Sequence, residues 1–233
     1  MSDLMGQAIW DFHHDNSPED LLTETTISEL EVMSVAYLFR EFDKMNIIEK
    51  KAMELTRGKV LDIGAGAGAH SIYLQDELGM DVTALEISHK SSEVCKLRGI
   101  RKVVCQHLLD FKEEKFDTIL LLMNGTGIFG KVDQVNTYLN KLYDLLKDDG
   151  QILIDSTDLI YMYNELNGLD LPIEKYYGEV EFTVYYKGKK QKPFPWLFID
   201  FKYFKSLANK SHLKAEKIQQ VGSAYLARLT KAK

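Results

Sequence analysis

Three glycines at alternate positions follow a short apolar run in the stretch VLDIGAGAGAH, from Val60 to His70. Gly64, Gly66 and Gly68 carry no side chains, so a ligand can approach the backbone closely at this turn. A phosphate-binding P-loop would continue with Gly-Lys-Ser or Gly-Lys-Thr, whereas Ala-His follows the third glycine here. The stretch therefore predicts a strand that ends in a ligand-binding loop of another kind.

Short apolar runs alternate with amphipathic segments through the middle of the chain. Strands are predicted at KVLDIG, DVTALEIS, RKVVCQ, FDTILLLM and QILIDS, and helices at HSIYLQDELG, SSEVCKLRG and VDQVNTYLNKLYDLLKDDG. This alternation is typical of an α/β protein with a doubly wound, mostly parallel sheet. Near the C-terminus, AEKIQQV and AYLARLT predict two strands joined at Gly222-Ser223, a pair suited to a type II′ hairpin turn.

The remaining segments predict additions to this core. Residues 1–27 have an irregular pattern, a capping box at Ser28 and Glu31 predicts a helix, and Asn46 with Glu49 predicts a second one. The segment at about 176–200 alternates at period two on both sides of KGKK, which predicts an antiparallel hairpin inserted after the fifth strand, and Asp200 would cap a following helix. We therefore divide the chain into an N-terminal region, 1–56, and a main domain, 57–233.

Composition bounds the function. The 233 residues carry a net charge of −6 and no lysine- or arginine-dense run, which argues against a nucleic-acid partner. The apolar run from Ile119 to Met123 is too short to span a bilayer, and the first residues have no signal-peptide pattern, so we expect a cytoplasmic protein without a membrane partner. Cys95 and Cys105 are expected to be unpaired, buried thiols. The oligomeric state is left open.

Two cofactor classes fit the glycine loop. Gly64, Gly66 and Ala69 match the dinucleotide fingerprint, and Glu86 follows at the end of the second strand, where an acid would bind a ribose. However, Asp62 lies inside the strand, where a carboxylate is costly unless loop amides or a ligand's ammonium group satisfy it. A long helical pattern also precedes this strand, whereas dinucleotide domains often open with it.

Several motifs together resemble the class I S-adenosylmethionine-dependent methyltransferase family. VLDIGAGAG is similar to the family's first motif and ALEIS to its acidic second one, while KFDTILLLMNGTGIFG and LLKDDGQILIDS resemble the regions of strands four and five. AEKIQQVGSAYLARL resembles the reversed hairpin that completes the family's seven-stranded sheet. The resemblance covers residues 57–157 and 200–231 and implies S-adenosyl-L-methionine as cofactor.

The resemblance also implies cofactor-binding roles. The loop glycines would face the methionine part, Asp62 would organise the loop and the ammonium group, and Glu86 would accept both ribose hydroxyls. The other candidates are Ile87 on the adenine face, Asp110 or the backbone of Leu108 and Leu109 at the adenine amine, and Asn124 and Gly125 beside the amino-acid end and the methyl group. Arg40 is either a partner of the cofactor carboxylate or an ordinary surface arginine.

Methyl transfer from a sulfonium is an in-line displacement that positioning alone can accelerate. We expect the segment from Gly6 to Leu22, with Trp10 and Phe12, to form a lid in which His13 or His14 is a general base; the alternative is a loose arm with solvated histidines. Asp155, Asp158 and Tyr161 follow the fifth strand and are further candidates, although Asp158 could simply cap a helix. The aromatic residues between 176 and 198 form either a pocket wall or hairpin packing.

The segment MNGTGIFG lacks the Asn/Asp-Pro-Pro-Tyr/Phe motif of enzymes that methylate planar nitrogens, so we expect a small-molecule O- or N-acceptor. Asn124 and Asp155 are too few ligands for a metal-dependent reaction, and no metal is expected. One alternative is a dinucleotide-dependent oxidoreductase, although neither Tyr161 nor Tyr163 has a lysine four residues later. The other is a cofactor-binding or partner-binding module on the same fold, without transfer activity.

Overall fold

The computed structural model describes residues 3–112, 114–163 and 170–232. Within this part of the chain the main sheet has the order β11-β12-β7-β6-β3-β4-β5. Neighbours from β7 to β5 pair in parallel, whereas β12 pairs antiparallel with β7 and β11. The strands are β3 (Val60–Ile63), β4 (Val82–Glu86), β5 (Lys102–Cys105), β6 (Phe116–Leu121), β7 (Leu146–Thr157), β11 (Leu213–Val221) and β12 (Ala224–Lys231). The predicted fold class, with its reversed C-terminal hairpin, is confirmed.

Helices cover both faces of this sheet, which is why its parallel strands are almost continuously apolar. One face packs against α5 (Val135–Leu145) and α6 (Phe201–Lys210), and the other against α2 (Ile47–Leu55), α3 (Ala69–Ile72) and α4 (His89–Leu97). The predicted capping box at Asn46 and Glu49 and the predicted cap at Asp200 are both present. None of the helices in the described residues is both long and apolar enough to cross a bilayer.

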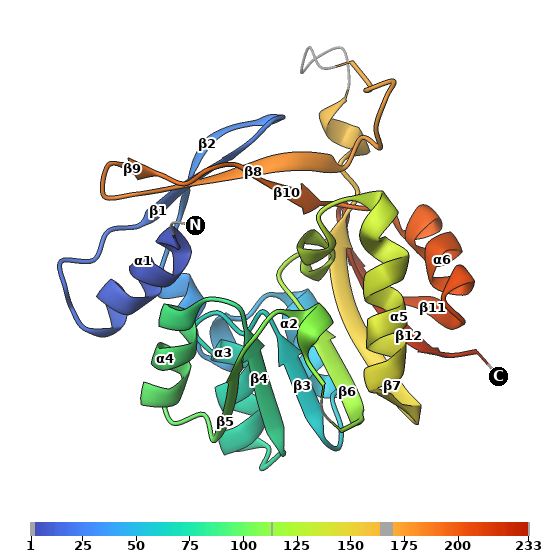
Figure 1. Ribbon diagram of the computed structural model, residues 1–233, viewed down its shortest axis with the longest axis horizontal. Coiled ribbons are helices and arrows are strands. Elements are labelled where there is room, and N and C mark those ends of the chain that lie inside the picture. The colour runs from blue at the N-terminus through green and yellow to red at the C-terminus, as the bar shows by residue number, and fades with distance from the viewer. Residues whose placement is uncertain (1–2, 113, 164–169, 233) are drawn as a thin grey trace.

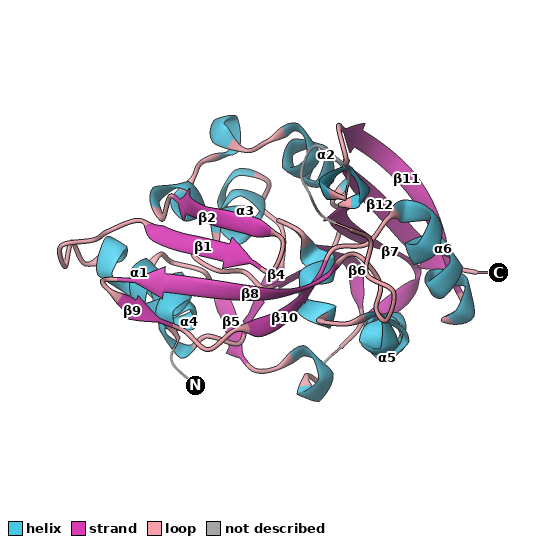
Figure 2. Ribbon diagram, turned by 90° about the horizontal axis from the view of Figure 1, so that it is seen from above, coloured by secondary structure: helices cyan, strands magenta, loops and turns pink. Residues whose placement is uncertain are grey.

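A second, antiparallel sheet lies over the carboxyl ends of the central strands (Figure 1). Its order is β10-β8-β1-β2, and β9 pairs with β8. The sheet joins β1 (Leu21–Thr25) and β2 (Ser28–Met33) to the predicted inserted hairpin, which comprises β8 (Glu179–Tyr186), β9 (Lys189–Lys190) and β10 (Phe194–Leu197). Figure 2 shows from above how this sheet extends across the main one. Segments more than 150 residues apart thus form one layer, because Leu22 pairs with Tyr185.

Four local predictions are wrong. Residues 4–13 form a helix, α1 (Leu4–His13), and β1 also lies in the segment that was expected to be irregular. The predicted helix at Ser28 is strand β2, because the Ser28 hydroxyl oxygen accepts the Thr25 amide and closes a hairpin turn instead of capping a helix. Helix α5 ends at Leu145, and the next residue already pairs with β6. Finally, Cys105 is exposed, whereas Cys95 is buried as expected; both are free.

Candidate functional site

The glycine loop joins β3 to α3 and leaves open backbone on one side. Gly64, Gly66 and Gly68 have φ angles of 73°, 58° and 82°, a left-handed conformation that strongly favours glycine. A Cβ atom at Gly64 or Gly66 would meet nothing within 4 Å, whereas one at Gly68 would lie 2.4 Å from Ile100 Cδ1. The first two glycines therefore offer backbone to a ligand, and the third is required by packing.

Two buried carboxylates hold this loop. Asp62 is 1% exposed, and its Oδ2 accepts a 2.6 Å hydrogen bond from the Ser71 hydroxyl in α3. Glu86, at the end of β4, accepts the Gly66 amide at 2.8 Å with Oε2 and the Ser88 amide at 2.9 Å with Oε1. Burial raises the pKa of Glu86, and the backbone amides oppose this increase. Each Glu86 oxygen retains acceptor capacity for a ligand hydroxyl.

The residues next to Glu86 offer surfaces for a flat ring. Ile87 is 67% exposed although it follows a buried strand directly. Beyond the neighbouring strand β5, residues Leu108–Asp110 form a turn in which His107 Nδ1 accepts the Leu109 amide at 3.2 Å. Leu108 is buried and Asp110 is exposed. The structure therefore places the predicted adenine residues on adjacent strand ends of the same sheet edge.

The turn after β6 is strained and is held by Asp155. Met123 and Asn124 have φ angles of 64° and 60°, which are uncommon for residues other than glycine. The Asp155 carboxylate accepts the Asn124 amide at 3.0 Å and the Gly125 amide at 2.9 Å. Burial raises the pKa of Asp155 to about 6, against the opposing effect of these two amides. In this arrangement the carboxylate contacts the turn, so its geometry is that of a positioning residue.

A buried ionic cluster lies beside this turn. Glu49 is 0% exposed and accepts hydrogen bonds from His70 Nε2 at 2.7 Å, from the Tyr37 hydroxyl at 3.0 Å and from Arg40. Although burial alone would raise the pKa of Glu49, the hydrogen bonds from His70 and Arg40 lower it to about 2. Arg40 Nη2 also contacts Met123 Sδ at 2.9 Å. Thus Arg40 is not an ordinary surface arginine.

The sequence did not predict that Glu49 and His70 lie in the buried ionic cluster beside the turn after β6. Glu49 was identified only as part of a capping box, which it does form through the Asn46 amide at 3.1 Å. His70 follows the glycine loop by two residues, but it lies 21 positions from Glu49. The closeness of His70 to the loop was the available signal; its pairing with Glu49 depends on tertiary packing.

Helix α1 packs against the glycine loop. Its side chain Ile9 packs with Ala67 of the loop and Val94 of α4, and Asp3 accepts a 2.6 Å hydrogen bond from the Ser88 hydroxyl. These two contacts attach α1 to the edge of the sheet that carries the glycine loop. Trp10 belongs to the same helix.

The two histidines of α1 lie at its C-terminal end. His14 donates from Nδ1 to the Trp10 carbonyl at 2.9 Å, and the two rings stack 4.0 Å apart. Burial lowers the pKa of His13, and the nearby charges of His14 and Arg98 lower it further. In Figure 1, α1 lies over α4, on the opposite side of the molecule from β7, which carries Asp155. The structure does not bring these candidate catalytic residues together.

The candidates after β7 lie in a different hollow. Asp158 Oδ1 accepts the Ile160 amide at 3.0 Å and the Tyr177 hydroxyl at 2.7 Å, so it closes a short turn. Tyr161 is 51% exposed and, with Asp158, Phe201 and Tyr225, lines a hollow of about 310 Å³ beside the C-terminal hairpin.

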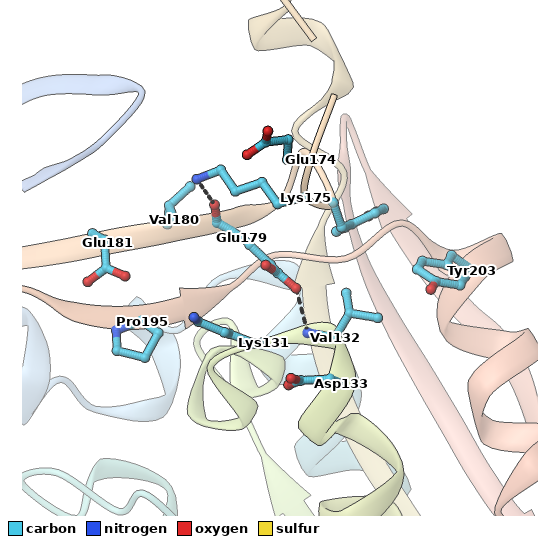
Figure 3. Close-up of a pocket in the computed structure, with 11 residues that line it drawn as sticks. Lys131, Val132, Asp133, Glu174, Lys175, Glu179, Val180, Glu181, Pro195 and Tyr203 are labelled. Carbon is cyan, nitrogen blue, oxygen red and sulfur yellow. Dashed lines mark hydrogen bonds between the residues drawn. The ribbon is translucent and has the colours of Figure 1, made fainter. Parts of the chain in front are cut away.

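A larger hollow, of about 560 Å³, is lined by residues of β8 and β10 and by residues 131–133 of the main domain (Figure 3). Its charged lining includes Lys131, Asp133, Glu174, Glu179 and Glu181. Its lining contains none of the residues predicted to bind the cofactor, and neither does that of the smaller hollow.

Comparisons with known proteins agree with this geometry. A family model described as a methyltransferase domain matches residues 61–154. A SAM-dependent methyltransferase from Bacteroides fragilis, solved in complex with S-adenosyl-L-homocysteine, is 40% identical to this chain, with a TM-score of 0.90 over 99% of this chain and 95% of that one. The sugar N-methyltransferase KedS8 from Streptoalloteichus sp. is 12% identical, with a TM-score of 0.57 over 80% of this chain and 85% of that one; it shares the fold.

Two curated relatives match only in part. Sphingolipid C9-methyltransferase B from Emericella nidulans is 29% identical over 136 residues, which are 54% of this chain and 24% of the fungal enzyme. The 23S rRNA (cytidine-2'-O)-methyltransferase TlyA from Campylobacter jejuni is 28% identical over 110 residues, which are 45% of this chain and 43% of that enzyme. The chain thus spans less than half the length of either relative.

Proposed function

The chain belongs to the S-adenosylmethionine-dependent methyltransferase family, and from this premise we propose that it methylates an oxygen or nitrogen atom of a small molecule. The cofactor is S-adenosyl-L-methionine, which decides between the two classes that the loop pattern left open. The observation that carries the acceptor class is the second sheet, which covers the carboxyl ends of the central strands (Figure 1). A small molecule fits beneath such a layer more readily than a folded nucleic acid. The net charge of −6 supports the same choice.

The residues at the loop fit the cofactor. The open positions at Gly64 and Gly66 would admit its methionine part, while Asp62 keeps the loop in place through Ser71. Glu86 would accept the ribose hydroxyls with its remaining lone pairs, and the exposed Ile87 would pack on the adenine. We also assign the adenine edge to Leu108, Leu109 and Asp110. When bound, the cofactor supplies a sulfonium methyl group whose thioether departs without protonation.

We assign the cofactor carboxylate to Arg40. This side chain is 7% exposed, and its Nε atom has no hydrogen-bond partner among the described residues. Glu49 and the Tyr37 carbonyl accept hydrogen bonds from the guanidinium and keep it in one orientation, so little ordering remains to be done when a carboxylate arrives.

Catalysis in this proposal rests on positioning. Asp155 fixes the backbone of Asn124 and Gly125, the turn that the acceptor and the reacting methyl group would share. The general-base roles of His13 and His14 and the role of Tyr161 stay predictions, which glutamine and phenylalanine substitutions test through kcat. A covering role for α1 also stays a prediction; hydrogen exchange in this helix should slow when S-adenosyl-L-homocysteine binds.

Transfer of labelled methyl from S-adenosyl-L-methionine to fractionated cell extract tests the proposed acceptor class. We expect the label in the small-molecule fraction. Label that appears only in RNA or in the long-chain lipid fraction would contradict the proposal. A thermal shift gives an independent check of the cofactor: S-adenosyl-L-homocysteine at a hundredfold excess over Kd should add about 2.7 kcal/mol of stability, and NAD none.

A further inference from the structure

The two faces of the second sheet differ in chemistry. On β8, Val184 and Tyr186 pack with Leu4 and Ala8 of α1, so this set of alternate residues faces the main domain. The other set includes Glu179 and Glu181, which line the larger hollow; at the start of β8 the Glu179 side chain reaches the main domain, because its Oε1 accepts the Val132 amide at 2.8 Å (Figure 3). Because side chains alternate along a strand, Val180 and Phe182 share the face of Val184 and Tyr186, which we call the inner face.

Three aromatic rings gather on this inner face. Phe182 pairs in register with Phe194 of β10, and Trp196 lies two residues further along the same strand. The ring centroid of Phe182 is 5.7 Å from that of Phe194 and 5.8 Å from that of Trp196, and the last two are 6.0 Å apart. All three side chains are half-buried, so part of each ring is available for contact.

The three aromatic rings lie between the turn held by Asp155 and the core under α1. Trp196 packs against the backbone of Gly127, where an added Cβ would be only 1.9 Å from its indole ring. The Asn124 side chain donates to the Leu197 carbonyl at 3.2 Å, which ties β10 to the turn held by Asp155. At the other end, Phe182 and Phe194 pack against the core under α1.

The inner face of β8 and β10 carries no charged side chain. Its members are Val180, Phe182, Val184, Tyr186, Phe194 and Trp196. On β1, Thr23 and Thr25 continue this face opposite Val184 and Phe182, whereas Glu24 pairs with Thr183 on the outer face. A phosphate-bearing acceptor needs cationic partners, which these strands do not direct inward.

We infer that the acceptor is an uncharged, planar ring compound, bound with its ring against Phe182, Phe194 and Trp196. Stacked and edge-on contacts with three rings recognise such a plane, and the Thr23 hydroxyl gives a hydrogen-bonding partner at its edge. This inference rests on the proposed function and narrows its acceptor class.

The test uses the full chain saturated with S-adenosyl-L-homocysteine. Calorimetry at pH 6.5 measures Kd for two uncharged planar probes, 7-hydroxycoumarin and 4-hydroxyquinoline. Three comparison probes separate the alternatives: glucosamine has no planar ring, adenosine monophosphate is planar but anionic, and 1-decanol is an apolar chain. We expect both planar probes to bind more tightly than all three comparison probes.

Phe182→Leu keeps an apolar side chain but removes the ring. It should weaken binding of the planar probes by about three- to tenfold, the value of one aromatic pair. Tyr185→Leu is the matched control, because it removes a ring from the outer face of the same strand, and it should leave these Kd values unchanged. Both variants should bind S-adenosyl-L-homocysteine as the unmodified protein does.

Either of two results would overturn the inference: tighter binding of a comparison probe, or equal losses from Phe182→Leu and Tyr185→Leu. If S-adenosyl-L-homocysteine binds but neither planar probe does, the acceptor class is wrong while the proposed function stands. If S-adenosyl-L-homocysteine itself does not bind, the proposed function fails as well.

Discussion

Replacement of Asp155 by asparagine tests how the turn after β6 is held. The carboxylate is 9% exposed, and both of its oxygens accept backbone amides, one from Asn124 and one from Gly125. Asparagine has nearly the same shape, but its NH₂ group faces one of these amides, which loses its acceptor. The substitution also removes the group whose pKa burial raises to about 6.

The magnitude follows from this pKa. The value for Asp155 rises from 3.8 to about 6, a change of about 2 pH units, and each unit corresponds to about 1.36 kcal/mol. The native state keeps its proton more tightly than the unfolded chain, so the contribution of Asp155 to stability is greatest below pH 3.8. It falls by about 3 kcal/mol as the pH rises through 6. At pH 8 this change offsets the loss of about 1–3 kcal/mol from one unpaired amide, so the Asp155→Asn variant should be about as stable as the unmodified protein.

Urea unfolding at several values between pH 4 and pH 8 measures this effect. The quantity to follow is the difference in unfolding free energy between the unmodified protein and the Asp155→Asn variant, because other titrating groups cancel in it. We expect the difference to shift by about 2.5 kcal/mol in favour of the variant from pH 4 to pH 8, because the unfolded chain is already partly ionised at pH 4. A difference that stays constant within about 0.5 kcal/mol would refute the burial of an ionisable carboxyl at this turn. In the folded variant kcat should also fall, because the turn loses one of its two anchors.

Three further predictions concern the loop and the thiols. Glu86→Gln should weaken S-adenosyl-L-homocysteine binding about 10- to 100-fold by calorimetry, and an unchanged Kd in a folded variant would place the ribose elsewhere. Gly68→Ala should cost about 2–4 kcal/mol in urea unfolding, because its Cβ would lie 2.4 Å from a neighbouring side-chain carbon, whereas Gly79→Ala, with open space, should cost only about 1 kcal/mol of backbone strain. Ellman's reagent should modify exposed Cys105 in the folded protein but reach Cys95, whose pKa burial raises to about 12, only after unfolding; two rapidly reacting thiols would contradict this burial.

Sequence predicts best what local chemistry determines. The capping box at Asn46 was predictable because its partners lie within one turn, and the turn at Gly222 because two residues suffice to make it. The same pattern at Ser28 led to a wrong helix, since the hydroxyl group is used by Thr25 in a hairpin that a distant strand stabilises.

In the candidate site, too, local patterns were predictable from the sequence and tertiary contacts were not. Asp62 lies within one predicted strand and Glu86 at the end of the next, so the sheet edge at which they act was predictable from the pattern. The contact between Glu49 and His70 was not, because it depends on how α2 and α3 pack on the same face of the sheet. The position of Asp155 near the carboxyl end of the fifth strand was predictable, but its two amide contacts depend on a strained turn that no local pattern indicates.

The composite second sheet affects the order in which the protein can fold. Strands β1 and β8 are far apart in the chain, with Leu22 opposite Tyr185, so a ribosome must synthesise β3 to β7 before this pair can form. Closing a loop of this length costs conformational entropy before the strand contacts form, so the pairing is slow. The layer over the cofactor site should therefore assemble after the parallel strands of the main sheet, and a nascent chain would have its glycine loop before this layer lies above it.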